Sequence, residues 1–108
     1  MLKKNYEFSR VFSKGTYFSG KEIEAFILNN GQKANYLGLA ISSKAGKAYQ
    51  RNRIKRLLRE NYKNYESQII EGISIVFLLK KKAEIQNVDF HSIRIDMEEI
   101  LKKANVIG

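Results

Sequence analysis

The chain has 108 residues, of which 44% are hydrophobic, a proportion typical of one folded domain and too high for a disordered chain. Its lack of cysteine excludes disulfides and thiolate metal sites, and favours a reducing compartment. Its net charge of +9 arises within residues 1–65, which hold fourteen basic and four acidic side chains, and this asymmetry indicates one surface for a polyanion, with nucleic acid favoured over an anionic membrane.

The sequence gives no sign of a membrane span or of a second domain. The longest apolar run, residues 73–79, is far shorter than the roughly 20 residues that a membrane-spanning helix needs. The N-terminal residues MLKKNYEF lack the apolar segment of a secretory signal. Because no proline, repeat or composition break marks a linker, we expect one cytoplasmic domain over residues 1–108.

The first half of the chain predicts one helix and three strands. The helix has apolar residues on one face, with Asn5 as its cap and Gly15 ending it in a left-handed conformation. Strand composition recurs in the following segments, and the turn at 29–35 predicts that the second and third strands form a hairpin. The expected elements are helix 5–14 and strands 16–19, 22–30 and 36–42.

The second half predicts a long helix at 48–65, a strand at 73–80 and a last helix. Asn87 or Asp89 can cap the last helix. Its apolar residues at helical spacing are Ile93, Met97, Ile100, Leu101 and Ala104. The order α-β-β-β-α-β-α predicts a small α+β sandwich, in which a four-stranded sheet packs with helices.

Residues 48–65, AYQRNRIKRLLRENYKNY, carry six Arg and Lys side chains and a single acid. At 3.6 residues per turn they separate into two faces. The apolar face comprises Ile54, Leu57, Leu58, Tyr62 and Tyr65, and the opposite stripe comprises Asn52, Arg56, Arg59 and Lys63, with Lys55 at its border. Solvated helix faces usually mix both signs of charge, whereas guanidinium groups in a row match phosphate oxygens. The helix therefore predicts contact with nucleic acid.

Two motifs resemble a known family, the protein component of bacterial ribonuclease P. The segment RNRIKRLLRE at 51–60, preceded by SSKAGKAYQ, resembles the family's signature, and KKNYEFSRVFSKG at 3–15 is similar to its first helix. The element order agrees with the family's fold, which is like the second domain of ribosomal protein S5. The chain differs from many members at Ser43, where they carry a basic residue, and at Tyr49, where they carry a small aliphatic one.

The resemblance implies a function in tRNA processing. Members are subunits of a ribonucleoprotein endonuclease that removes the 5′ leader of precursor tRNA, and a catalytic RNA with bound Mg²⁺ performs the hydrolysis. The expected partners are therefore the catalytic RNA and precursor tRNA, with neither a membrane nor a small-molecule substrate.

The resemblance also assigns residues to two surfaces. Contact with the catalytic RNA is implied for Arg51, Asn52, Arg53, Lys55, Arg56, Arg59 and Lys63, and a cleft for the leader is implied for Lys4, Asn5, Phe8, Phe12 and Phe26. Spacing alone favours a hydrophobic core for the three phenylalanines, and only the resemblance favours the cleft. Burial of all three rings would contradict the cleft.

No set of residues in the sequence predicts a catalytic centre within the protein. His91 has no second histidine or cysteine to complete a zinc site, so we expect no metal there. Glu22 and Glu24 share a strand face without a partner suited to hydrolysis. The run Lys80–Lys82 fits a solvated strand end better than a phosphate contact. Two rival functions stay open: a ribosomal-protein-like RNA binder without a processing role, and an autonomous nuclease.

Overall fold

The computed structural model describes residue 2 and residues 4–107, so Lys3, which begins the motif at 3–15, lies outside the described part. The elements are α1 (Asn5–Lys14), β1 (Thr16–Ser19), β2 (Ile23–Asn29), β3 (Tyr36–Leu39), α2 (Ala48–Tyr65), β4 (Ile73–Leu79) and α3 (Phe90–Lys103), with short 3₁₀ turns at Glu66–Gln68 and Ile85–Asn87. Their order and the α+β class are those expected from the sequence.

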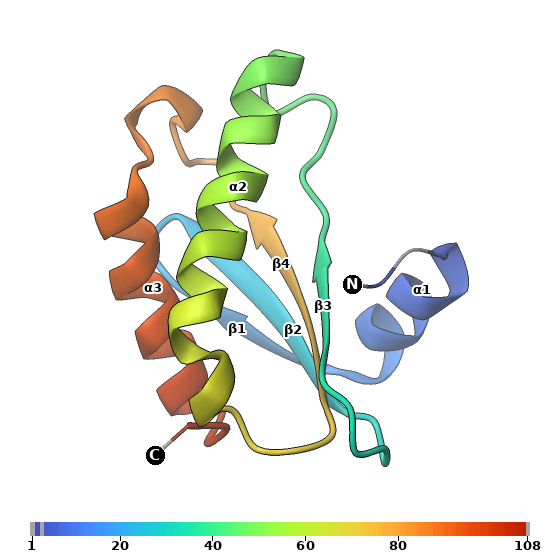
Figure 1. The fold of residues 1–108 in the computed structure, drawn as a ribbon. Coiled ribbons are helices and arrows are strands. Elements are labelled where there is room, and N and C mark those ends of the chain that lie inside the picture. The colour runs from blue at the N-terminus through green and yellow to red at the C-terminus, as the bar shows by residue number, and fades with distance from the viewer. Residues whose placement is uncertain (1, 3, 108) are drawn as a thin grey trace.

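The four strands form one mixed sheet in the order β1-β2-β4-β3 (Figure 1). β2 pairs antiparallel with both β1 and β4, whereas β3 runs parallel to β4. The expected hairpin of the second and third strands is therefore wrong, because β4 lies between them. All seven residues of β2 pair with the seven of β4, which gives a longer ladder than the four residues of β3 could provide.

The sheet is covered unequally on its two faces. α2 and α3 lie side by side over one face, and the short α1 lies against part of the other (Figure 1). Alternation along β2 sends Ile23, Ala25 and Ile27 into the main core under α2 and α3, and sends Phe26 toward α1. One face is thus a closed core, and the other stays partly open.

The ends of α1 differ from the expectation. Lys4, not Asn5, is the N-cap, and its backbone N–H donates to the Glu7 carboxylate at 2.9 Å. Gly15 ends the helix with φ −77°, in an extended rather than left-handed conformation. Glycine is needed there for space, since a β-carbon would lie 2.5 Å from the Val11 carbonyl oxygen.

α3 makes polar contacts at its N-terminus and through its buried Asp96. Asp89, one of the two expected caps, accepts a hydrogen bond from the Ser92 N–H at 2.8 Å. The buried Asp96 carboxylate accepts from the backbone N–H groups of Glu22 and Ile23, at 2.6 and 3.1 Å. These bonds join α3 to the start of β2 and satisfy backbone donors of the β1–β2 turn.

Candidate nucleic-acid interface

The long helix α2 begins and ends where the sequence predicted, and its two faces are arranged as expected. The apolar side is buried against the sheet and α3 through Ile54, Leu57, Leu58, Tyr62 and Tyr65, joined by the buried Asn61. Asn52, Arg56, Arg59 and Lys63 are exposed on the other side, and Lys55 is half-buried between the faces. The packing of one face therefore presents the other as a row of cations.

Little within the protein neutralises this row. Arg56 and Glu60 form a loose, exposed ion pair at 3.8 Å. Among the residues that the structure describes, no other α2 side chain has an oppositely charged partner within 4.0 Å. The first turn of α2 contains Arg51 and no acidic residue, and a cation near the positive N-terminal end of a helix costs about 0.3–1 kcal/mol. A bound anion, such as a phosphate, would neutralise these cations and would also interact favourably with the positive end of the helix dipole.

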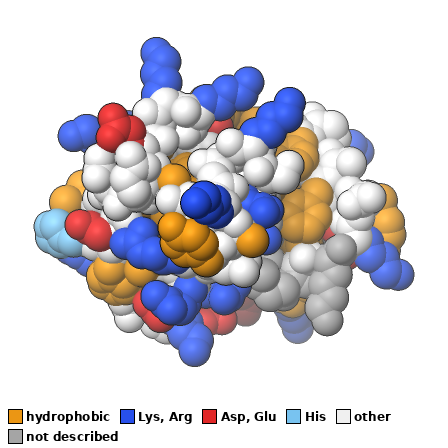
Figure 2. Space-filling model, turned by 90° about the horizontal axis from the view of Figure 1, so that it is seen from above, with side chains coloured by type: hydrophobic (Ala, Val, Ile, Leu, Met, Phe, Trp, Pro, Cys, Tyr) orange, Lys and Arg blue, Asp and Glu red, His pale blue; other side chains and the backbone are white. Residues whose placement is uncertain are grey.

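The loop before α2 extends the basic surface. The half-buried Arg51 donates from Nε to the Gly46 carbonyl at 3.2 Å, which ties the helix to this loop. Lys44 and Lys47 of the loop are exposed, as is Tyr49 in the first turn. Figure 2, viewed onto the end of the molecule where α2 begins, shows Lys and Arg side chains spread across this end among hydrophobic ones.

Four aromatic rings form a continuous cluster on the open face of the sheet. Phe8 and Phe12 of α1 have ring centroids 6.5 Å apart, and Phe12 meets Phe26 of β2 edge-on at 5.2 Å. Tyr17 of β1 follows, 5.3 Å from Phe26. Phe12 is 36% exposed and Tyr17 is 49% exposed, while Phe8 and Phe26 are half-buried. The rings are thus not all buried, and the cluster offers aromatic faces to solvent.

Tyr17 is the member of this cluster that sequence analysis missed. The segment 16–19 indicated a strand, but nothing in it indicated which residue of another strand would lie opposite. The β1–β2 register sets Tyr17 across from Phe26 and thereby adds a fourth ring. Segments 16–19 and 22–30 could have been recognised as antiparallel neighbours. Aligning their inward and outward residues would then have placed Tyr17 beside Phe26.

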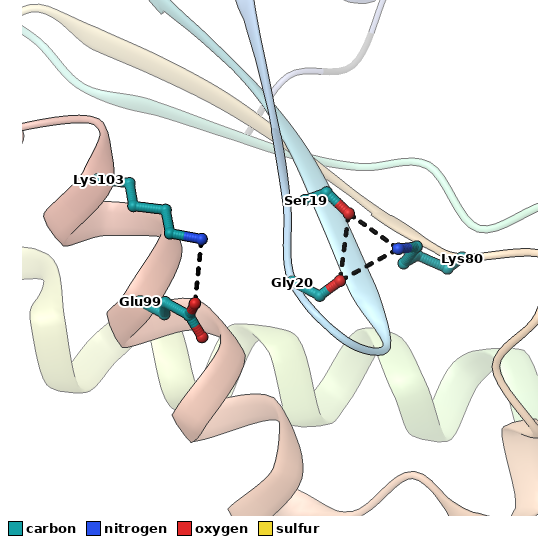
Figure 3. A network of polar contacts seen from close by, with 5 residues as sticks. All are labelled: Ser19, Gly20, Lys80, Glu99 and Lys103. Atoms are coloured by element: carbon teal, nitrogen blue, oxygen red, sulfur yellow. Dashed lines mark hydrogen bonds and ion pairs between the residues drawn. The ribbon is translucent and has the colours of Figure 1, made fainter.

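A polar segment continues the cluster along the same face. The Tyr17 hydroxyl donates to the Glu24 carboxylate, and this bond is the main reason that the pKa of Tyr17 is raised above its usual value. Beyond it, the Lys80 ammonium donates to Ser19 Oγ at 2.9 Å and to the Gly20 carbonyl at 3.2 Å (Figure 3). Lys80 is therefore a bound, half-buried cation, whereas Lys81 and Lys82 are exposed at the strand end.

Lys4 and Asn5 lie exposed at the start of α1. The Lys4 ammonium is 5.9 Å from the centre of the exposed Tyr6 ring, within cation–π range. Behind this end, a groove of about 260 Å³ lies between α1 and the sheet, and Tyr6, Arg10 and Tyr36 are among its lining residues. The expected cleft residues thus lie along one side of the sheet, with Lys4 and Asn5 at the N-terminal end of α1.

The two expected surfaces occupy opposite faces of the sheet. α2, which carries the cations, lies over one face of the sheet, and α1 partly covers the other (Figure 1). The rings of Phe8 and Phe26 lie on the α1 side. The members of each expected set lie near one another, but the structure does not merge the two sets into one site. A ligand that occupies both must pass around the edge of the sheet, or two ligands must bind.

In residues 2 and 4–107, no three His, Asp or Glu side chains gather closely enough to hold a metal ion. His91 is exposed, with Nδ1 3.3 Å from Nη2 of Arg94. None of the helices seen in this part of the chain has the length and apolar character to span a bilayer.

Comparison with known proteins adds independent information. A family model described as Ribonuclease P matches residues 1–105. The ribonuclease P protein component of Caldanaerobacter subterraneus subsp. tengcongensis is 38% identical over 103 residues, covering 95% of this chain and 87% of the relative. That of Natranaerobius thermophilus is 34% identical, covering 98% and 90%.

Similar solved structures are RNase P proteins as well. The RNase P protein of Staphylococcus aureus superposes with a TM-score of 0.86 at 31% identity, covering 99% of this chain and 96% of that one. The RNase P protein of Thermotoga maritima, in complex with 1-(4-fluorophenyl)-2-thiourea, gives 0.87 at 30% identity, covering 95% and 98%. This chain therefore has the same fold as these two RNase P proteins.

Proposed function

The chain belongs to the ribonuclease P protein component family, and from this premise we propose that its two surfaces serve two RNA molecules. Membership makes it an RNA-binding subunit of a tRNA-processing endoribonuclease, and the alternative of a ribosomal-type binder without a processing role does not hold. In our proposal α2 docks on the catalytic RNA, and the aromatic face holds the 5′ leader of precursor tRNA. The cytoplasm, where tRNA precursors arise, is the proposed location.

The aromatic cluster is the observation that carries the leader assignment. A partly exposed row of four rings, with Phe12 and Tyr17 open to solvent, suits unpaired bases, since any base can stack on an aromatic face. A leader is single-stranded and differs in sequence between tRNAs, so a binder that relies on stacking tolerates that variety. Lys4 and Asn5, exposed at the end of α1, would contact its backbone.

The cations of α2 support docking on the larger RNA. Its outward side chains are mainly cations, which suits contact with the phosphates of a folded RNA. The residues proposed for this contact are Arg51, Asn52, Arg53, Lys55, Arg56, Arg59 and Lys63. Because α2 and the aromatic face lie on opposite faces of the sheet, the protein can bind both RNAs at once and hold the leader beside the catalytic RNA.

We assign the hydrolysis itself to the RNA subunit. The described part of the chain offers no cluster of three acidic or histidine side chains for a metal ion, so Mg²⁺ would be held mainly by RNA phosphates. The protein contributes binding and positioning. Its cations lower the repulsion between two polyanions, which should reduce the Mg²⁺ concentration needed for cleavage.

Reconstitution tests this proposal. The purified protein alone should not cleave precursor tRNA, and its addition to the cognate catalytic RNA at low Mg²⁺ should restore cleavage at the mature 5′ end. The gain should be larger for a precursor with a leader of several nucleotides than for one with a single leader nucleotide. Cleavage by the protein alone would favour the autonomous nuclease, and an equal gain for both precursors would overturn the leader assignment.

A further inference from the structure

An acidic side chain, Glu24, lies beside the aromatic rings on the open face of the sheet. Glu24 lies on β2 two residues before Phe26, and both side chains face away from the main core. Its position is fixed by the hydrogen bond from the Tyr17 hydroxyl, whose ring also lies 5.3 Å from Phe26. A carboxylate beside a polyanion weakens binding unless the nucleic acid supplies hydrogen-bond donors to it.

The Glu24 carboxylate has acceptor capacity to spare. An ionised carboxylate offers about four lone-pair positions, and the Tyr17 hydroxyl occupies one of them. Within the described residues, Glu24 has no Lys or Arg nitrogen within 4.0 Å. The Tyr17 phenol is protonated at neutral pH, since the ordinary tyrosine pKa is about 10, so it donates to the carboxylate and orients it. The Glu24 carboxylate is thus a hydrogen-bond acceptor that Tyr17 holds in place beside the aromatic rings.

We propose that Glu24, oriented by Tyr17, reads the Watson–Crick edge of one leader base that stacks beside Phe26, and that it selects guanine over uracil. This inference rests on the proposed function, because it needs the leader on this face. Guanine presents N1–H and an N2 amino group side by side, which matches the two oxygens of a carboxylate. Uracil presents a single N3–H between two carbonyl oxygens, which would face the carboxylate. Adenine and cytosine, each with one amino donor beside an acceptor, should rank between them.

Lys80 places a positive charge near Glu24, on the same open face of the sheet. Ser19, which accepts from the Lys80 ammonium, is the cross-strand partner of Glu24. The described residues place no carboxylate within 4.0 Å of that ammonium, so its positive charge is available to RNA. Stacking rings, a base-edge acceptor and a cation therefore follow one another along one face, which matches the base and the phosphate of a single nucleotide.

The test is competitive cleavage by the reconstituted holoenzyme. Precursor tRNAs are prepared with guanine or uracil at each leader position in turn, and the ratio of kcat/KM is measured for each pair. At one position guanine should be preferred about tenfold, the discrimination expected of a bidentate contact. Glu24→Gln should reduce that ratio to near one, and Tyr17→Phe, which frees the carboxylate to rotate, should reduce it partly.

Charge must be separated from recognition in this experiment. Glu71→Gln removes the same negative charge from an exposed residue in the turn before β4, and should leave the ratio unchanged. An unaltered ratio in Glu24→Gln, or a wild-type protein without any guanine preference, would overturn the inference. If the wild-type protein fails to accelerate cleavage of any leader-bearing precursor, the proposed function fails instead, so the two failures are distinguishable.

Discussion

The ring of Phe8 lies against Gly38 so closely that no side chain fits between α1 and β3. A β-carbon on Gly38 would be 2.7 Å from Cε1 of Phe8 and 3.0 Å from a methyl carbon of Leu2. Gly38 of β3 thus leaves room for the Phe8 ring, while α1 itself packs against β2 and β4. The position of Phe8 in the aromatic cluster depends on this absence of a side chain.

Gly38→Ala should therefore displace α1 and disturb the aromatic face. We expect a loss of about 1–3 kcal/mol in the free energy of unfolding, measured by urea denaturation, because overpacking forces the Phe8 ring to move. The leader-dependent gain in cleavage should fall as well. The double variant Phe8→Ala/Gly38→Ala removes the clash, so its loss should be smaller than the sum of the single losses. Additive losses would show that the two residues do not interact in this way.

Phe26→Leu tests stacking at the centre of the cluster. Removing an aromatic face costs about 1–3 kcal/mol per stacked base, so the leader-dependent gain in kcat/KM should fall about tenfold. Cleavage of a precursor with a single leader nucleotide should barely change. Phe18→Leu is the matched control, since Phe18 packs against the core on the other face of the sheet. An equal fall in both variants would indicate lost stability rather than lost stacking.

Arg59→Ala tests the cationic face of α2. Affinity for the catalytic RNA should decrease, and the slope of log K against log salt should become shallower by about one unit, because one phosphate contact is lost. The loss should not depend on the leader. Lys102→Ala serves as the control, because Lys102 is an exposed cation of α3 whose ion-pair partner is Glu98 at 3.8 Å. The same slope change in the control would point to net charge alone.

Asp89 gives the folded state a defined dependence on acid. The hydrogen bond from the Ser92 backbone N–H is the main cause that lowers the pKa of Asp89 below its usual value. A lowered folded-state pKa means that the stabilisation is fully present above the ordinary aspartate pKa of about 3.9, and is lost as the pH falls through the lower value. An asparagine at this position would still cap the helix without titrating.

Unfolding curves of wild type and Asp89→Asn, measured between pH 7 and pH 2.5, check this prediction. The stability difference between the two proteins should be constant above about pH 5 and should change in favour of the variant as the pH falls below about 4. A difference that stays constant throughout the acid range would show that this carboxylate does not titrate differently in the folded state.

Local periodicity in the sequence was enough to predict the helices of this protein and their buried faces. The eighteen residues of α2 repeat an apolar pattern over five turns, and a helix contains its own hydrogen bonds, so its limits and both of its faces followed from sequence alone. The same holds for the buried face of α3. The resemblance of two motifs indicated the family before any tertiary contact was known.

Which strands pair with one another, and in which register, was decided only by the tertiary structure. Alternation along a strand predicts which side chains share a face, but it does not say which strand lies beside it, because ladder hydrogen bonds join distant segments. β4, and not β3, therefore lies next to β2. Only the register of β1 on β2 brought Tyr17 to Phe26 and Glu24, and turned three expected phenylalanines into a longer surface with an acceptor at its end.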